Sequence, residues 1–136
     1  MNQEERNMPM RVTREEVLEK CKGMLLKQFY VVFSKPTAGL GPVMENVAQH
    51  LAHQCKIERE GILVAAGPFW TDDVIYFEGE GMFVYRASSI DHARELAAAD
   101  PMHQCGARSF TVRPWLVNEG RLNLQIDFST GKMTLD

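Results

Sequence analysis

The stretch Leu25-Leu-Lys-Gln-Phe-Tyr-Val-Val-Phe-Ser-Lys35 decides the fold of this 136-residue chain. It is rich in aromatic and β-branched residues, which are typical of strands, and apolar side chains fall on both of its faces. The segment Pro36-Thr-Ala-Gly-Leu-Gly-Pro42 then predicts a loop, because its prolines and glycines interrupt regular structure. We therefore expect the fold to begin with a strand that is buried on both sides.

The residues after this loop predict two helices and three further strands. Apolar spacing indicates a first helix up to Arg59 and a second helix that stops at Asp100, because Pro101 disfavours helical backbone in the residue before it. The resulting order is β-α-β-β-α-β, the ferredoxin-like arrangement of the α+β class. Right-handed crossovers then put both helices on one face of a four-stranded antiparallel sheet. The other elements are expected at residues 43–59 (helix) and at 62–66, 82–87 and 108–115 (strands).

The first helix is predicted to bury one apolar stripe. At about 100° per residue, its apolar side chains fall on one side and its charged or polar ones on the other. Cys55 belongs to the apolar side and is expected to be a small core residue. The predicted stripe consists of Val43, Met44, Val47, Ala48, Leu51 and Cys55.

Two extensions flank the predicted domain. Residues 1–23 are expected to form an N-terminal helical extension, in which Thr13 and Glu16 have the spacing of a capping box ahead of a short amphipathic helix. Residues 24–116 would form the ferredoxin-like domain. Residues 117–136 predict a C-terminal β-hairpin, because apolar and polar side chains alternate from Leu122 to Phe128.

Composition excludes several classes of function. The formal net charge of -3 is not that of a nucleic-acid-binding protein, and we expect no nucleic-acid partner. No apolar stretch is long enough to span a membrane, and the charged N-terminus is unlike a signal peptide. The 3 cysteines argue against a disulfide framework and favour a cytoplasmic protein.

The sheet face opposite the helices predicts a partner. Phe29, Val31 and Phe33 alternate with Tyr30 and Val32, so the first strand presents apolar side chains on both faces. A small sheet cannot leave such a face in water, and a second subunit is the simplest cover. We expect a homodimer of the dimeric α/β barrel type.

Three segments resemble the YciI-like, or YCII-related, family. They are His50-Leu-Ala with Glu60-Gly-Ile-Leu-Val-Ala-Ala-Gly-Pro68, then Ala97-Ala-Ala-Asp-Pro-Met102, and last Phe110-Thr-Val-Arg-Pro-Trp115. The resemblance implies a dimeric α/β barrel with a site built from a histidine and an aspartate, which correspond here to His50 and Asp100. It also implies relatives that act as isomerases or lyases on intermediates of aromatic catabolism.

The two site candidates also stand out by their positions. His50 lies at the edge of the apolar stripe, and imidazoles, with an ordinary pKa of about 6.5, suit proton transfer at neutral pH. Asp100 points with the apolar face of its helix, so its pKa is expected to be raised unless a cation or donor lies near. The alternatives are a boundary histidine bonded to backbone or water, and an aspartate that caps the turn after Pro101.

Other polar and aromatic side chains are candidates for substrate binding. Arg108 could bind a substrate carboxylate, although an outward salt bridge is the alternative. We also expect His103, Tyr30 and Tyr85 to contact substrate, with core packing as the alternative for the tyrosines. The histidine and cysteine spacing is a poor metal signal, and no phosphate-binding glycine loop is present, so neither a metal nor a cofactor is expected.

Three functional hypotheses remain open from the sequence. The first is a small cofactor-independent lyase or isomerase, in which Asp100 orients His50 and His50 moves a proton on a small organic acid. The second is a dimeric protein that binds a small molecule without catalysis. The third is a structural protein that docks a partner through its N-terminal helix.

Overall fold

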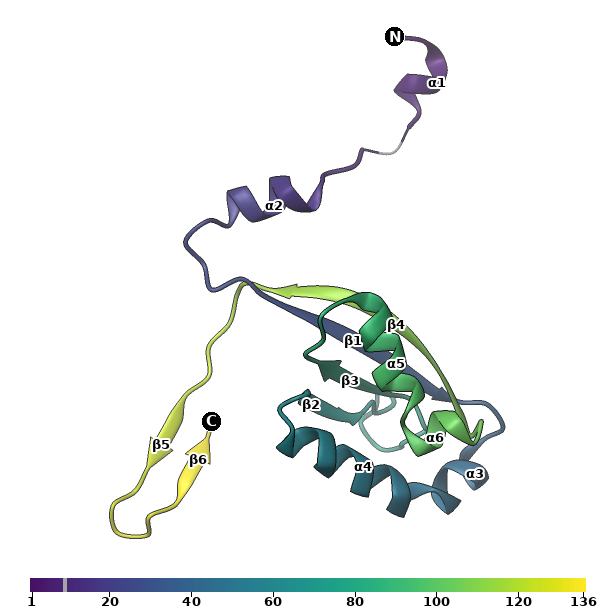
Figure 1. Ribbon diagram of the computed structural model, residues 1–136, viewed down its shortest axis with the longest axis vertical. Helices are drawn as coiled ribbons and strands as arrows, with labels where there is room; N and C mark the ends of the chain where they lie inside the picture. The colour runs from purple at the N-terminus through teal and green to yellow at the C-terminus, as the bar shows by residue number, and fades with distance from the viewer. Residues whose placement is uncertain (9) are drawn as a thin grey trace. The chain divides into compact units, whose positions relative to one another are not determined.

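The computed structural model describes residues 1–8 and 10–136 (Figure 1). The chain divides into two compact units. The larger unit is Gln28–Leu116, and the smaller one combines Met1–Lys27 with Val117–Asp136.

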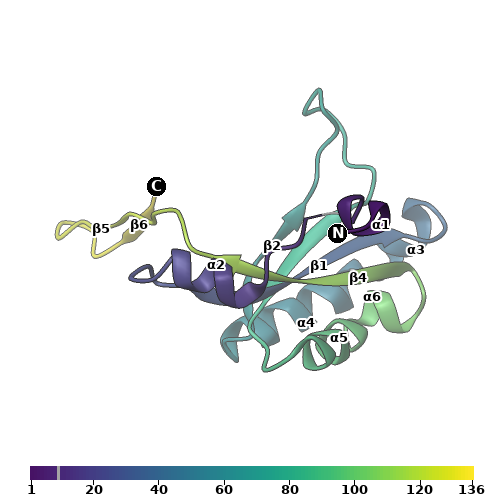
Figure 2. The same ribbon diagram turned by 90° about the horizontal axis from the view of Figure 1, so that it is seen from above.

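The larger unit, all of whose residues are described, is built on a four-stranded sheet in the order β2-β3-β1-β4. The strand β3 pairs antiparallel with β1 and with β2, and Val32 lies opposite Phe83. Figure 2 shows that α4 (Val47–Arg59), α5 (Ile90–Ala98) and α6 (Pro101–Gln104) lie together on one face of this sheet. The predicted ferredoxin-like arrangement is therefore confirmed. The strands are β1 (Lys27–Pro36), β2 (Leu63–Pro68), β3 (Gly81–Tyr85) and β4 (Arg108–Val117).

The helices differ from the prediction at two breaks. The single helix expected over 43–59 is two helices, α3 (Leu40–Glu45) and α4 (Val47–Arg59). At the break, Asn46 donates a side-chain hydrogen bond to the Pro42 carbonyl at 2.8 Å and so replaces part of the helical bonding. The second predicted helix corresponds to α5 (Ile90–Ala98), which ends before Asp100. A separate short helix, α6 (Pro101–Gln104), begins directly after Asp100.

The core lies between the sheet and the helices. Val32, Phe83 and Tyr85 of the sheet pack against Ile57 of α4 and Ala97 of α5. A second cluster joins the start of the helical layer to the start of β4, through Val43, Met102 and Ala107.

The buried side of α4 is rotated from the predicted stripe. Cys55 is exposed, so its predicted place in the core is wrong. The buried side chains are Gln54 and Ile57, which lie one turn and two turns after His50. Leu51, which also belongs to the predicted stripe, is exposed and borders a cavity.

The smaller unit contains short elements. The helices are α1 (Gln3–Arg6) and α2 (Arg14–Lys20), and the predicted capping box is present: Thr13 Oγ1 accepts from the Glu16 backbone at 3.2 Å, and Glu16 Oε2 accepts from the Thr13 backbone at 2.6 Å. The strands β5 (Leu124–Ile126) and β6 (Met133–Leu135) form an antiparallel pair. In the described part of the chain, we find no helix with the length and apolar character needed to cross a membrane.

Candidate active site

Asp100 is held by the start of α6. It is fully buried, and its Oδ1 accepts a hydrogen bond from the Met102 backbone N–H at 2.9 Å. Aspartate is favourable just before a helix, because its side chain accepts a hydrogen bond from a backbone N–H that has no partner within the helix. Proline is favourable at the first helical residue, because it has no backbone N–H that needs a partner. The local sequence Asp-Pro-Met therefore fixes the carboxylate in place.

The helix α4 brings His50 against this carboxylate. The imidazole Nδ1 lies 2.8 Å from Oδ2 and 3.1 Å from Oδ1 of Asp100. Its ring centroid lies 5.7 Å from that of Phe83. Because an ionised carboxylate only accepts hydrogen bonds, Nδ1 carries the hydrogen and donates it. In the neutral ring, Nε2 is then the nitrogen with a free electron pair, which is the state that a general base needs.

Opposing effects set the pKa of Asp100. Burial by itself raises this pKa, because it disfavours the charged form. The hydrogen bonds from His50 and from the Met102 backbone, together with positive charge on His50 and His103, outweigh burial, so the pKa lies below its ordinary value. Asp100 both caps the turn and pairs with His50.

A cavity of about 630 Å³ lies along this face of α4. His50 forms part of its wall, and most of the other lining side chains are apolar. The aromatic side chains Trp70 and Phe77, from the connection between β2 and β3, contact each other edge to face with ring centroids 6.5 Å apart. The lining residues are Val43, Met44, Val47, His50, Leu51, Gln54, Glu58, Leu63, Val64, Ala65, Ala66, Gly67, Pro68, Trp70, Phe77, Glu80, Gly81, Phe83, Met102 and Arg108.

Arg108 supplies a cation to the cavity. It is buried, and its Nη1 donates a hydrogen bond to the Gly79 carbonyl. Its Nε is also buried and has no hydrogen-bond partner among the described residues. Burial lowers the pKa of this guanidinium, and the negative charge of Asp100 opposes that change. Arg108 is therefore positioned by backbone and not by the outward salt bridge that the sequence left open.

His103 lies in the packed layer beside the pair. Its Nδ1 donates to the Ala97 carbonyl at 2.6 Å, so its Nε2, 2.8 Å from the Ser34 hydroxyl, accepts from that hydroxyl in the neutral ring. Its ring also contacts Phe110, with centroids 4.5 Å apart. Burial lowers the pKa of His103 and favours the neutral form. These bonds occupy both ring nitrogens inside the protein.

The two tyrosines lie together in the sheet. Tyr30 on β1 is directly opposite Tyr85 on β3. Tyr85 is fully buried, and burial and the charge of Asp100 both raise its pKa. Neither tyrosine is among the residues that line the cavity. The structure thus brings His50, Asp100 and Arg108 together, whereas His103 and the tyrosines lie outside the cavity wall.

Gln54 is a further polar residue of the cavity, and the sequence patterns did not single it out. It lies four residues after His50 on α4, so the two share one helix face. That spacing is the signal that could have identified it. As to metals, the described residues hold no group of three or more histidine, cysteine, aspartate or glutamate side chains arranged to bind one.

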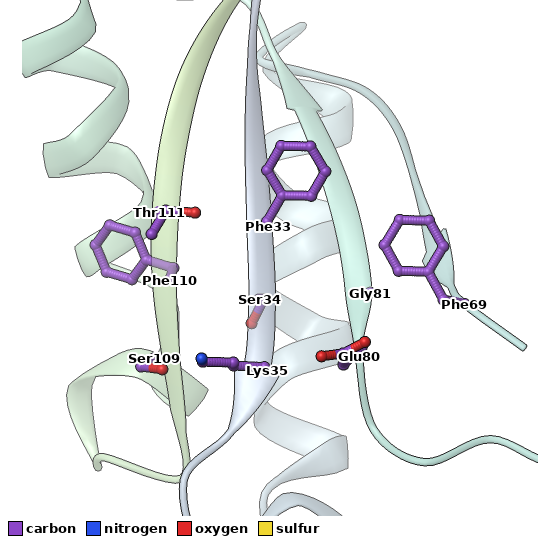
Figure 3. Close-up of a pocket in the computed structure, with 9 residues that line it drawn as sticks. All are labelled: Phe33, Ser34, Lys35, Phe69, Glu80, Gly81, Ser109, Phe110 and Thr111. Carbon is purple, nitrogen blue, oxygen red and sulfur yellow. The ribbon is translucent and has the colours of Figure 1, made fainter. Parts of the chain in front are cut away.

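A second, smaller hollow of about 200 Å³ lies over β4, β1 and β3 (Figure 3). In this view the helices are behind the sheet, and the rings of Phe33 and Phe69 border the hollow. Phe33 is 39% exposed and Phe69 is 43% exposed. Part of the sheet face that carries no helices is therefore apolar and open to solvent.

The chain is thus a small α+β protein of the ferredoxin-like class, with a buried aspartate that is paired with a histidine beside a cavity. The family model of the YCII-related domain matches residues 28–116, and the chain belongs to this family. A similar solved structure is 5-chloro-2-hydroxyhydroquinone dehydrochlorinase from Burkholderia phenoliruptrix AC1100 in complex with 2,5-dihydroxybenzoquinone. It is 22% identical, with a TM-score of 0.52, and the match covers 64% of this chain and 92% of that one. No curated protein matches the chain.

Proposed function

We propose that this protein is a cofactor-independent lyase or isomerase that moves a proton on a small cyclic organic acid. The observation that carries the proposal is the 2.8 Å hydrogen bond from His50 Nδ1 to Asp100 at the wall of a cavity of about 630 Å³. A buried carboxylate that orients a histidine leaves the second ring nitrogen as a general base. The cavity has room for a ligand of one ring.

In the proposed reaction, His50 Nε2 takes a proton from a carbon or hydroxyl of the substrate. The electron pair of the broken bond moves into the ring system of the substrate, and Asp100 stabilises the imidazolium that forms. An isomerase then returns the proton to another atom of the substrate. In a lyase, the proton is returned to the ring carbon that bears the leaving group, which gives a ketone tautomer with that carbon tetrahedral. His50 then takes a proton from another hydroxyl, the leaving group departs with the electrons of its own bond, and the proton passes from His50 to solvent. Arg108 stabilises the negative charge that develops on a substrate oxygen.

The comparisons support the choice of substrate class. The similar structure is, by its name, a dehydrochlorinase of a chlorinated hydroxyhydroquinone, and it was solved with a dihydroxybenzoquinone. Both are single rings that bear several oxygens. The apolar walls around His50 suit a flat ring, and Arg108 suits an anionic oxygen.

Two assays with the full chain test the proposal. The first measures chloride release from 5-chloro-2-hydroxyhydroquinone, and the second measures solvent deuterium incorporation into benzene-1,2,4-triol by NMR. We expect the wild-type protein to accelerate at least one process and His50→Gln to lower that rate by about 10²- to 10⁴-fold. His53→Gln is the matched control, because His53 lies on the same helix outside the cavity lining.

Two outcomes would contradict the proposal. If His50→Gln keeps the wild-type rate while folded, the imidazole is not the base. If the wild-type protein binds 2,5-dihydroxybenzoquinone but changes neither substrate, the chain is a binding protein and the enzymatic proposal is wrong.

We further propose that the protein is a homodimer. In this dimer, a second copy covers the sheet face shown in Figure 3. Support comes from the open hollow beside Phe33 and Phe69, since exposed apolar surface of this kind marks an interface. Sedimentation velocity is expected to give a dimer for the wild type and a monomer for Phe33→Glu. Lys56→Glu, on the exposed side of α4, should stay dimeric, and a monomeric wild type would refute the assembly.

A further inference from the structure

The side chain of Gln54 is buried without an internal explanation. Its exposed fraction is 7%, yet neither Oε1 nor Nε2 finds a hydrogen-bond partner within the described part of the chain. Burial of a polar group without hydrogen bonds is costly, and native structures contain few such groups. A leucine of similar size would fill the same place without that cost.

The position of Gln54 connects it to the site. It lines the same cavity as His50 and follows it by four residues in α4, a separation of about 6 Å along the helix axis. Leu51 and Glu58, which lie three residues before and four residues after Gln54 on the same helix, also line the cavity. Glu58 is exposed, whereas the amide of Gln54 is buried without a partner among the described residues, so the amide is the buried polar group at this part of the cavity that still needs a hydrogen-bond partner.

Arg108 lies toward the other end of the cavity. It follows Ala107, which packs with Val43 near the beginning of the helical layer, whereas Gln54 follows His50 toward the end of α4. His50 thus lies between a cation and a neutral amide along the cavity. A guanidinium favours an anionic oxygen, whereas an amide donates and accepts and so suits a hydroxyl or a carbonyl.

We propose that Gln54 is the specificity-determining residue of this site and hydrogen-bonds a neutral hydroxyl or carbonyl oxygen of the substrate. The inference rests on the proposed function and names its substrate class more closely. The substrate is a one-ring acid with an anionic oxygen at one end, held by Arg108, and a neutral oxygen at the opposite end, held by Gln54. The atom that exchanges its proton with His50 lies between them.

A pair of ligands of the same shape tests the proposal. 4-Hydroxybenzoate and 4-methylbenzoate both carry a carboxylate, and they differ only in a hydroxyl or methyl group at the opposite end of the ring. By titration calorimetry, wild-type protein should bind 4-hydroxybenzoate about tenfold more tightly or better, because the methyl group leaves the amide unpaired. In Gln54→Leu, the preference should disappear or reverse.

Control variants separate this effect from a change in folding. Gln49→Leu makes the same substitution on the exposed side of α4 and should keep the wild-type preference. Should Gln54→Leu fail to fold, Gln54→Met has the length of glutamine without its polar atoms and serves in its place.

The results distinguish this inference from the proposed function. If the variant at position 54 still prefers 4-hydroxybenzoate, the role of Gln54 is wrong, whatever His50→Gln does to the rate. If the preference depends on Gln54 but His50→Gln reacts as fast as wild type, the specificity role stands and the catalytic proposal is wrong. If wild-type protein binds neither benzoate at millimolar concentration, the proposed ligand class is wrong and the inference is overturned.

Discussion

His50 Nδ1 lies 2.8 Å from Oδ2 of Asp100, although 50 residues separate the two in the chain. The side chain of Asp100 is fully buried and that of His50 is 17% exposed, so the pair spans the boundary between the core and the cavity. The carboxylate accepts from the imidazole and from the Met102 backbone at the same time. One aspartate thus fixes both the turn at α6 and the orientation of the proposed base.

Asp100→Asn separates these two roles. The asparagine carbonyl can still accept from the Met102 backbone, so the fold should remain. Its NH₂ group would donate to His50 Nδ1 and leave the hydrogen on Nε2, which removes the base. We expect kcat for chloride release from 5-chloro-2-hydroxyhydroquinone to fall about 10²- to 10⁴-fold. Unchanged kcat in the folded variant would refute the role of Asp100.

The lowered pKa of His103 predicts a loss of stability in acid. The folded state binds its proton less readily than the unfolded state, whose histidine pKa is about 6.5. The stabilisation is therefore complete above about pH 6.5 and is lost as the pH falls from there through the folded-state pKa. Urea unfolding at neutral pH and at about pH 5 should show this loss in the wild type and a smaller loss in His103→Gln. Equal losses in both proteins would contradict the prediction.

Gln54→Leu should make the free protein more stable. The amide makes no hydrogen bond to the described residues, so leucine removes a burial cost and keeps a side chain of similar volume. Leucine also favours the helix slightly more than glutamine does. We expect the free energy of unfolding to rise by about 1 kcal/mol, measured by urea denaturation without ligand. A destabilised variant would indicate that the amide is satisfied in the free protein.

Gly79→Ala should disturb the cation of the site. Gly79 has a φ of +107°, where other residues are strained, and a Cβ there would overlap Cγ of Pro36. The carbonyl of this glycine anchors Arg108, so a shift of the backbone moves the guanidinium. We expect a loss of about 1–3 kcal/mol in stability together with weaker binding of 4-hydroxybenzoate.

Gly131→Ala is a suitable comparison for that variant. Gly131 also has a positive φ of 67°, but a Cβ added to it would meet no atom within 4 Å, and it belongs to the smaller unit. The variant should lose stability through backbone strain alone and keep wild-type ligand affinity. If both alanine variants bind the benzoate equally well, Gly79 does not position Arg108.

Local patterns predicted the order of the strands and the main helices and the two residues of the pair, but not the division of the first helix at Asn46 or the short helix α6. The apolar strand around Val32, the capping box at Thr13 and the stop before Pro101 each depend on neighbouring residues, so they could be recognised without coordinates. His50 and Asp100 stood out for the same reason, because each is a polar residue in an apolar pattern. Their proximity in space was an expectation from the family resemblance.

Tertiary packing decided what the local patterns could not. The apolar stripe of α4 suggested that Cys55 is buried, but the helix packs with Gln54 and Ile57 inward and leaves Cys55 exposed. For Arg108, an outward salt bridge was the commoner interpretation from the sequence, but in the structure the guanidinium donates to the Gly79 carbonyl, 29 residues away.

The sequence by itself determined the order of strands and helices, because propensity, capping and turn formation are properties of neighbouring residues. Only the tertiary structure decided which polar groups are buried without partners and which face the cavity. That outcome depends on how segments distant in the chain pack against one another, and a rotation of one helix by a fraction of a turn changes it.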